Sequence, residues 1–301
     1  MMSMQHDPMD TISIAYGLAL AIVIGALVGR TTTGFALLLL NLGVGLVALT
    51  ALPRLRARGG LSRFLGVTLP LIVFYLYYRE TAVVLSQPDI AWLDRLVAGV
   101  ELRAWESIAS DPRSPVLGEL FALAYMSYVP LLLVVAVGLL RHPDRGPMGQ
   151  AERFVRRVCL SWGICYILFL AVPVLGPRFA FAGLQEPRMG TGPFSVIARL
   201  NQDHGMVRGA AFPSAHVAAT VIALWSVWCS KRSWFWWLLP VGAGLAIGAV
   251  YLGYHYVIDV LAGIFIGGVA IGIDQVGVRH RAISRRWSSS REALHEEGTF
   301  P

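Results

Sequence analysis

The chain has 301 residues, of which 56% are hydrophobic and only 14% are charged, a composition that excludes a soluble domain of this size and indicates an integral membrane protein. Arginine supplies almost all of the formal net charge of +7, and no basic run is interleaved with aromatic residues. We therefore expect membrane lipids with anionic headgroups as partners, and no nucleic acid.

The charged residues divide the chain into apolar segments of membrane length. A helix needs about 20 residues to cross the hydrocarbon core, and each segment has roughly that length. In chain order the segments lie near residues 11–29, 33–52, 64–78, 116–140, 158–177, 212–230, 233–252 and 255–274. The sequence therefore predicts an all-α, polytopic membrane helical bundle with about eight transmembrane helices.

These segments group into three predicted parts. Residues 1–63 hold two N-terminal transmembrane helices, and residues 64–278 form a six-helix catalytic core. The first apolar stretch has no basic region before it and no small-residue cleavage site, so we expect it to be retained as a span. Residues 279–301 are polar, and we expect a largely disordered cytoplasmic tail there.

The distribution of arginine and lysine predicts the orientation, because cytoplasmic loops hold the excess of both. The loops at 53–63, 141–157 and 231–232 and the tail from residue 275 carry 16 of them, and the opposite side carries nine. Both termini are then cytoplasmic, and the loop at 178–211 faces the extracytoplasmic side of what we expect to be a bacterial-type plasma membrane.

The segment between Pro88 and Ser110 has a different pattern. Leu93, Leu96 and Val100 recur there at helical spacing, with charged residues off that face. This pattern indicates an amphipathic helix that lies in the outer interface. Such a helix connects two spans along the surface, and it could also guide a lipid substrate.

Two histidines stand at the start of predicted helices on the same side of the membrane. His216 ends the sequence FPSAH (212–216), and His255 lies in YHYVID (254–259). Asp259 follows His255 by four residues, on the same side of the helix, so its carboxylate can accept a hydrogen bond from that ring. Such a bond orients one imidazole nitrogen and raises the nucleophilicity of the other.

The residues before and after the first histidine motif are suited to an anion. Pro213 fits a first helical turn, and the small Ser214 and Ala215 leave room for an anion at the positive end of the helix. Arg178 and Arg208 could supply the planar donors that grip phosphate oxygens. Ser214 could equally serve only as the helix cap. We expect a phosphate as the ligand.

Taken together, these motifs resemble the type 2 phosphatidic acid phosphatase and haloperoxidase superfamily, in particular its membrane branch related to inositol phosphorylceramide synthases. The family pattern is KxxxxxxRP, then PSGH, then SRxxxxxHxxxD, and the resemblance covers roughly residues 118–274. Arg178 matches the first block, Pro213, Ser214 and His216 match the second, and His255 and Asp259 match the third.

The chain also departs from the family pattern. The first-block lysine is Ala171 and the following proline is Phe179, while the serine and arginine of the third block are Gly248 and Ala249. Ala215 replaces the glycine of PSGH. Losses of this kind are familiar from the sphingolipid phosphotransferase branch, whose proposed triad is two histidines and an aspartate. Arg208 or Arg188 could replace the lost cations.

The resemblance implies a displacement at phosphorus that needs no metal and no cofactor. His255 would attack the phosphorus of a lipid phosphate, Asp259 would stabilise the cationic ring, and His216 would protonate the leaving oxygen. Arg178, Arg208 and Ser214 would stabilise charge on the phosphoryl oxygens. With water as acceptor the enzyme is a lipid phosphatase with a phosphohistidine intermediate, which is our first interpretation, and with an alcohol it is a phosphotransferase.

Three other classes of function compete with this interpretation. Two histidines and an aspartate can hold zinc, although Cys159, Cys165 and Cys229 show no ligand spacing and read as packing residues. An intramembrane serine protease needs a glycine-flanked nucleophilic serine within a span, and no predicted span of this sequence contains one. A transporter or scaffold would keep its function after His255→Gln. Nothing in the sequence indicates the lipid tail or the oligomeric state.

Overall fold

The computed structural model describes residues 32–85, 114–141, 149–180 and 189–297, together with six isolated helical residues at positions 17, 19, 22, 97, 99 and 101. For residues 279–297 it describes the backbone alone. Within these ranges the chain is helical and contains no strand, which confirms the all-α prediction.

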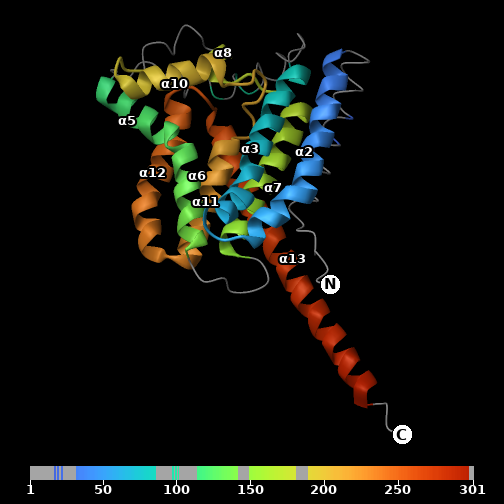
Figure 1. Cartoon of the computed structure of the whole chain (residues 1–301). Coiled ribbons are helices and arrows are strands. Elements are labelled where there is room, and N and C mark those ends of the chain that lie inside the picture. Colours follow the sequence, from blue (N-terminus) through green and yellow to red (C-terminus); the bar gives the residue numbers. More distant parts are fainter. Residues whose placement is uncertain are drawn as a thin grey trace.

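The helices stand side by side as a bundle, with two short helices across one end (Figure 1). Their bounds, in chain order, are α2 Thr32–Ala57, α3 Gly60–Leu85, α5 Pro115–Met126, α6 Tyr128–Leu140, α7 Gln150–Ala171, α8 Pro177–Ala180, α10 Pro193–His204, α11 Ala215–Ser230, α12 Arg232–Tyr251 and α13 Val257–Glu297.

Several of these helices are long and apolar enough to cross a membrane. Five helices are long and apolar enough individually, over Leu39–Ala57, Gly60–Leu85, Gln150–Ala171, Arg232–Tyr251 and Val257–Val278. The pair α5 and α6 makes a sixth if it is counted as one span, whereas α11 is apolar but has only 16 residues. The described residues therefore support an integral membrane bundle of five or six spans. The predicted span at 11–29 lies outside them, apart from three isolated positions.

The span predicted at 116–140 is bent by 45° at Ser127. Pro130 has no N–H to donate to the carbonyl of Met126, so the helical ladder is interrupted just after the bend. The Ser127 hydroxyl donates to the carbonyl of Ala124 at 2.6 Å, within the last turn of α5. The bend gives α5 a direction of its own, and α5 then packs against α10 and α12.

Helix α7 supplies much of the core, and two thirds of its apolar window is buried. It packs against α3, α6, α11 and α13. Helices α11 and α13 approach each other closely through glycine: a Cβ at Gly263 would lie 2.5 Å from the Ser214 carbonyl oxygen, and one at Gly267 would lie 2.8 Å from that of Ala218. This contact places the start of α11, which bears His216, next to the start of α13, which follows His255 in the chain.

Helix α10 lies over this end of the bundle and is held at both of its ends. Glu119 on α5 accepts hydrogen bonds from the backbone N–H groups of Phe194 and Ser195, which satisfies the start of α10. At its other end Arg79 on α3 donates to the carbonyls of His204 and Gly205 at 3.2 and 2.9 Å. The position of α10 is therefore defined by α3 and α5.

The end of the chain differs from the sequence-based expectation. Residues 279–297, which we expected to be disordered, continue α13 as a helix that leaves the bundle (Figure 1). Extending an existing helix costs far less than starting one, and the segment contains five arginines and three glutamates, which favour helix.

Candidate active site

The candidate site is assembled where two loops pair. Val174, after α7, forms an isolated parallel bridge with Ala210, before α11. The N–H of Val174 donates to the carbonyl of Gly209 at 3.1 Å, and the N–H of Ala211 donates to the carbonyl of Val174 at 3.0 Å. Gly176 has φ +89°, a region that favours glycine, and a Cβ there would lie 3.0 Å from that of Ala211. The loop that carries Arg178 is thereby held against the FPSAH segment.

His255 has a defined orientation. Its Nδ1 lies 2.8 Å from the carbonyl oxygen of Ala211, and because a carbonyl only accepts, Nδ1 carries the hydrogen. In the neutral ring Nε2 then holds the lone pair. Both His255 and Asp259 are buried, with 5% and 0% of their surfaces exposed. The ring therefore presents one nucleophilic nitrogen.

Asp259 lies beside this ring but is not its nearest acceptor. Its Oδ2 is 3.5 Å from His255 Nδ1, an ion-pair distance, and the same oxygen accepts a shorter bond of 2.7 Å from the backbone N–H of Tyr256. The expected hydrogen bond from the ring thus goes to Ala211, whereas the carboxylate is positioned to stabilise positive charge on the ring. No sequence pattern links Ala211 to His255, 44 residues away.

His216 faces the same region. Its ring centroid is 6.2 Å from that of His255, a separation at which one phosphoryl group can contact both rings. Tyr128 and Tyr125 flank it at 4.4 and 5.2 Å between centroids, and the Tyr125 hydroxyl lies 3.5 Å from His216 Nδ1. Tyr125 also stacks on Tyr254 at 4.0 Å. Tyr125 and Tyr128 thus form a wall beside His216.

Ser214 caps α11 and links it to α13. Its hydroxyl accepts from the N–H of Val217 at 3.4 Å, and its own N–H donates to the carbonyl of Asp259 at 2.9 Å. The side chain is fully buried. Of the two roles that the sequence left open, the cap is the one present in the structure.

The two predicted phosphate-binding arginines lie around Phe179, the residue at the position of the family proline. The Cζ atoms of Arg178 and Arg208 are 5.9 and 5.6 Å from its ring centroid. Arg178 Nη2 pairs with Asp203 Oδ1 at 2.5 Å, and this hydrogen bond holds the pKa of Asp203 below its usual value. Arg188 lies outside the described residues.

Asp203 is the residue of this group that the sequence analysis missed. It lies 25 residues from Arg178, on a helix within a segment that we expected to be a loop, and no spacing rule connects the two. The structure thus contains an imidazole group, His216 and His255 with Asp259, and an arginine group, Arg178 and Arg208 with Asp203. The loop pairing at Val174 and Ala210 joins them.

The structure also bears on the metal alternative and on the cysteines. Within the described residues, no group of three or more histidine, cysteine, aspartate or glutamate side chains could hold a metal ion. Cys159 and Cys165 are buried in the apolar core, and Cys229 is exposed.

Comparison with known proteins places the chain in a family. No curated protein and no solved structure matches the chain. The family model described as the PAP2 superfamily matches residues 99–273. This range includes both histidine motifs, the arginine-bearing loop and the helices that hold them, and it covers more than half of the chain. The chain therefore belongs to the PAP2 superfamily, whose members are phosphoesterases.

Proposed function

We propose that the protein is a lipid phosphatase that removes phosphate from a lipid phosphate or pyrophosphate through a phosphohistidine intermediate. The observation that carries this proposal is the orientation of His255. A backbone carbonyl holds its Nδ1–H, Nε2 is left as a nucleophile, and a second imidazole lies 6.2 Å away. This is the arrangement that a covalent nucleophile and a separate acid require.

In the first step Nε2 of His255 attacks phosphorus as the bond to the lipid oxygen breaks. The ring becomes cationic, and the Ala211 carbonyl and the Asp259 carboxylate, 2.8 and 3.5 Å from Nδ1, stabilise that charge. Protonated His216 transfers its proton to the departing lipid oxygen. The products of this step are the free lipid alcohol and phosphohistidine.

In the second step His216, now neutral, accepts a proton from water. The water oxygen bonds to phosphorus while the N–P bond breaks, and the electron pair returns to Nε2 of His255. Inorganic phosphate leaves, and both histidines regain their starting states. The reaction balances with one water consumed and no metal or redox partner.

Arg178 and Arg208 are our candidates for binding the phosphate oxygens. Arg178 already holds a carboxylate, that of Asp203, so a phosphate must displace or share this partner. Two oxygens of a phosphate can take both arms of one guanidinium, which a single carboxylate oxygen does not. Ser214 contributes by holding the first turn of α11, whose N–H groups favour an anion.

A transferase is the alternative, and one observation favours it. The position of the third-block arginine is Ala249, which is fully buried, and a Cβ at the neighbouring Gly248 would lie 2.9 Å from the carbonyl oxygen of Phe121. Long cationic side chains have no room there. A site with fewer cations suits the single negative charge of a phosphodiester better than the double charge of a monoester.

One experiment tests both functions. The purified protein is incubated with a panel of labelled lipid phosphates and phosphodiesters, with and without inositol or another polyol. Release of inorganic phosphate supports the phosphatase, and a new phosphodiester that forms only with the polyol supports the transferase. If neither product forms with any lipid, the proposal is wrong. A strong chelator added to an active pair tests the expected metal independence.

The proposed extracytoplasmic location of the site has a test of its own. Thr191 is exposed, in the loop before α10, and Cys229 is exposed at the other end of α11. In intact cells an impermeant maleimide should label Thr191→Cys and leave Cys229 unlabelled until the membrane is permeabilised. The reverse pattern would place the site on the cytoplasmic side.

A further inference from the structure

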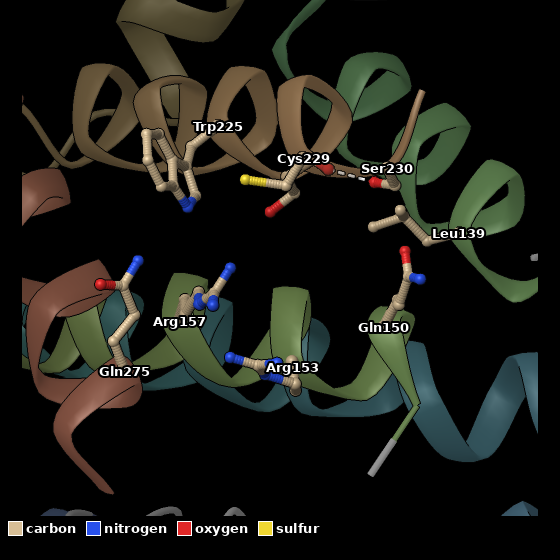
Figure 2. A pocket seen from close by; sticks show the side chains of 9 residues that line it. Leu139, Gln150, Arg153, Arg157, Trp225, Cys229, Ser230 and Gln275 are labelled. Carbon is tan, nitrogen blue, oxygen red and sulfur yellow. Dashed lines mark hydrogen bonds between the residues drawn. The ribbon is translucent and has the colours of Figure 1, made fainter. Parts of the chain in front are cut away.

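A second polar site lies at the opposite end of the bundle from the histidines. It is a cavity of about 290 Å³ between α6, α7, α11 and α13, at the C-terminal end of α11, whereas His216 lies in its first turn. Figure 2 shows Arg153 and Arg157 on α7, facing Trp225 and Cys229 on α11 across this space. Its volume is near the lower end of the range of ligand pockets, about 300–1,000 Å³.

Positive charge dominates this cavity. Arg153 Nη2 and Arg157 Nη2 lie 3.0 and 2.8 Å from the same oxygen of Asp274, and Arg156 contacts the other carboxylate oxygen. One buried carboxylate thus contacts three guanidiniums. The other acidic side chain on this part of α7, Glu152, pairs with Arg63. A link between α7 and α13 needs only one of these arginines, and charge within a membrane span is costly.

The lining of this cavity also contains a buried hydroxyl without a hydrogen-bond partner among the described residues, which indicates a ligand. Ser226 lines the cavity with 5% of its surface exposed, and no described residue gives its hydroxyl a hydrogen-bond partner. Buried hydroxyls almost always have one. Gln150 and Gln275 add amide groups to the lining. Guanidinium groups, hydroxyls and amides all donate hydrogen bonds that phosphate oxygens can accept.

We propose that this cavity binds a phosphate group. The group can belong to the headgroup of an anionic phospholipid in the leaflet at that end, or it can be soluble phosphate, and the chemistry of recognition is the same. Arg153 and Arg157 would each turn one guanidinium arm from Asp274 to the phosphate, and Ser226 would donate its hydroxyl. The site is separate from the histidines, so the proposal does not rest on the proposed function.

Cys229 provides a local measure of binding. It is exposed and lines the cavity, whereas Cys159 and Cys165 are fully buried, so a maleimide added to the folded protein reports on Cys229. The rate of alkylation is measured on the full chain in neutral detergent at constant ionic strength. The probes are inorganic phosphate, micelles with phosphatidylglycerol, and micelles with phosphatidylcholine as the zwitterionic control. Ligand at ten times its Kd should slow alkylation about tenfold.

Two matched arginine variants separate binding from general charge attraction. Arg153 and Arg63 are exposed to similar extents, 29% and 31%, and each pairs with a carboxylate, but only Arg153 lines the cavity. Arg153→Gln should raise the concentration for half-protection about tenfold, the loss expected for one charge-assisted hydrogen bond. Arg63→Gln should leave it unchanged. Ser226→Ala should give a smaller shift in the same direction and carries the test if Arg153→Gln fails to fold.

The outcomes are distinct. Protection by phosphatidylglycerol alone identifies a lipid headgroup, and protection by inorganic phosphate identifies a soluble anion. Either result supports the site. Equal alkylation rates with and without every probe, or equal shifts in the two arginine variants, would overturn the proposal.

Discussion

Helix α13 carries two buried aspartates in contrasting surroundings. Asp259, in the first turn, is held by the backbone N–H of Tyr256 and lies 3.5 Å from a single imidazole. Asp274, fifteen residues further on, is shared by three arginines. Both side chains are almost completely buried, with 0% and 1% exposed. One helix therefore carries two differently used carboxylates.

The difference is one of charge balance. In the proposed mechanism the group beside the first aspartate is a ring that gains positive charge during the reaction, and the negative charge of Asp259 is available to stabilise it. At the second, permanent cations outnumber the carboxylate. We infer that the Asp259 end is arranged for chemistry, and that the Asp274 end is arranged to hold the helices together and to attract an anion.

The largest expected effect comes from removing the nucleophile. His255→Gln should lower kcat by at least about a thousandfold, on the order of effects at catalytic nucleophiles, because no phosphohistidine can form. The rate of phosphate release from the lipid that proves to be a substrate in the labelled panel measures this loss of kcat. His204→Gln, an exposed histidine at the end of α10, is the control and should retain activity. Near-normal turnover by His255→Gln would contradict the covalent mechanism.

Removing the carboxylate of Asp274, at the other end of the bundle, should lower the stability of the protein. Asp274→Asn removes the carboxylate that the buried Arg157 shares with Arg153 and Arg156. Breaking a buried pair in this way lowers the free energy of unfolding by about 3–5 kcal/mol. We expect a clear drop in Tm of the detergent-solubilised protein. Asp203→Asn removes an exposed pair and should change Tm little. Equal Tm values for the two variants would contradict the contrast between the ends.

Local rules made part of this architecture predictable. The i, i+4 spacing of His255 and Asp259 predicted that the two side chains lie close together, and they are 3.5 Å apart, although His255 precedes α13 by two residues. Apolar length identified α3, α7, α12 and α13 as spans. The bend at Ser127 depends on one missing hydrogen bond, which a hydropathy pattern does not register. The helical tail was missed because composition describes solubility better than helix propagation.

Contacts between distant segments were not predictable from this one sequence. The Ala211 carbonyl reaches His255 because two loops pair, and Asp203 reaches Arg178 because Glu119 and Arg79 hold α10 in place. The arginines at 153, 156 and 157 follow a helical spacing, but their common carboxylate comes from 117 or more residues later. Tertiary packing alone brings these groups together.

Loss of the proposed acid should depend on the leaving group. His216→Ala should slow release of a lipid alkoxide by about 100-fold or more, because this oxygen needs a proton, and should slow release of nitrophenolate much less. The comparison of kcat for the two substrates measures the role of His216. Tyr128→Phe, which keeps the ring beside His216, is the control for altered packing. Equal losses for both substrates would contradict the assigned role.

The smallest expected effect concerns the partner of Arg178. Asp203→Asn removes the carboxylate that competes with phosphate, so KM should fall a few-fold with kcat unchanged. The sign of the pH dependence follows from the lowered pKa of Asp203: the ion pair is present above the ordinary carboxyl pKa and is lost only as pH falls through a still lower value. The KM ratio of wild type to variant should therefore be constant between pH 5 and 8. A ratio that changes within this window would show that another titrating group controls Arg178.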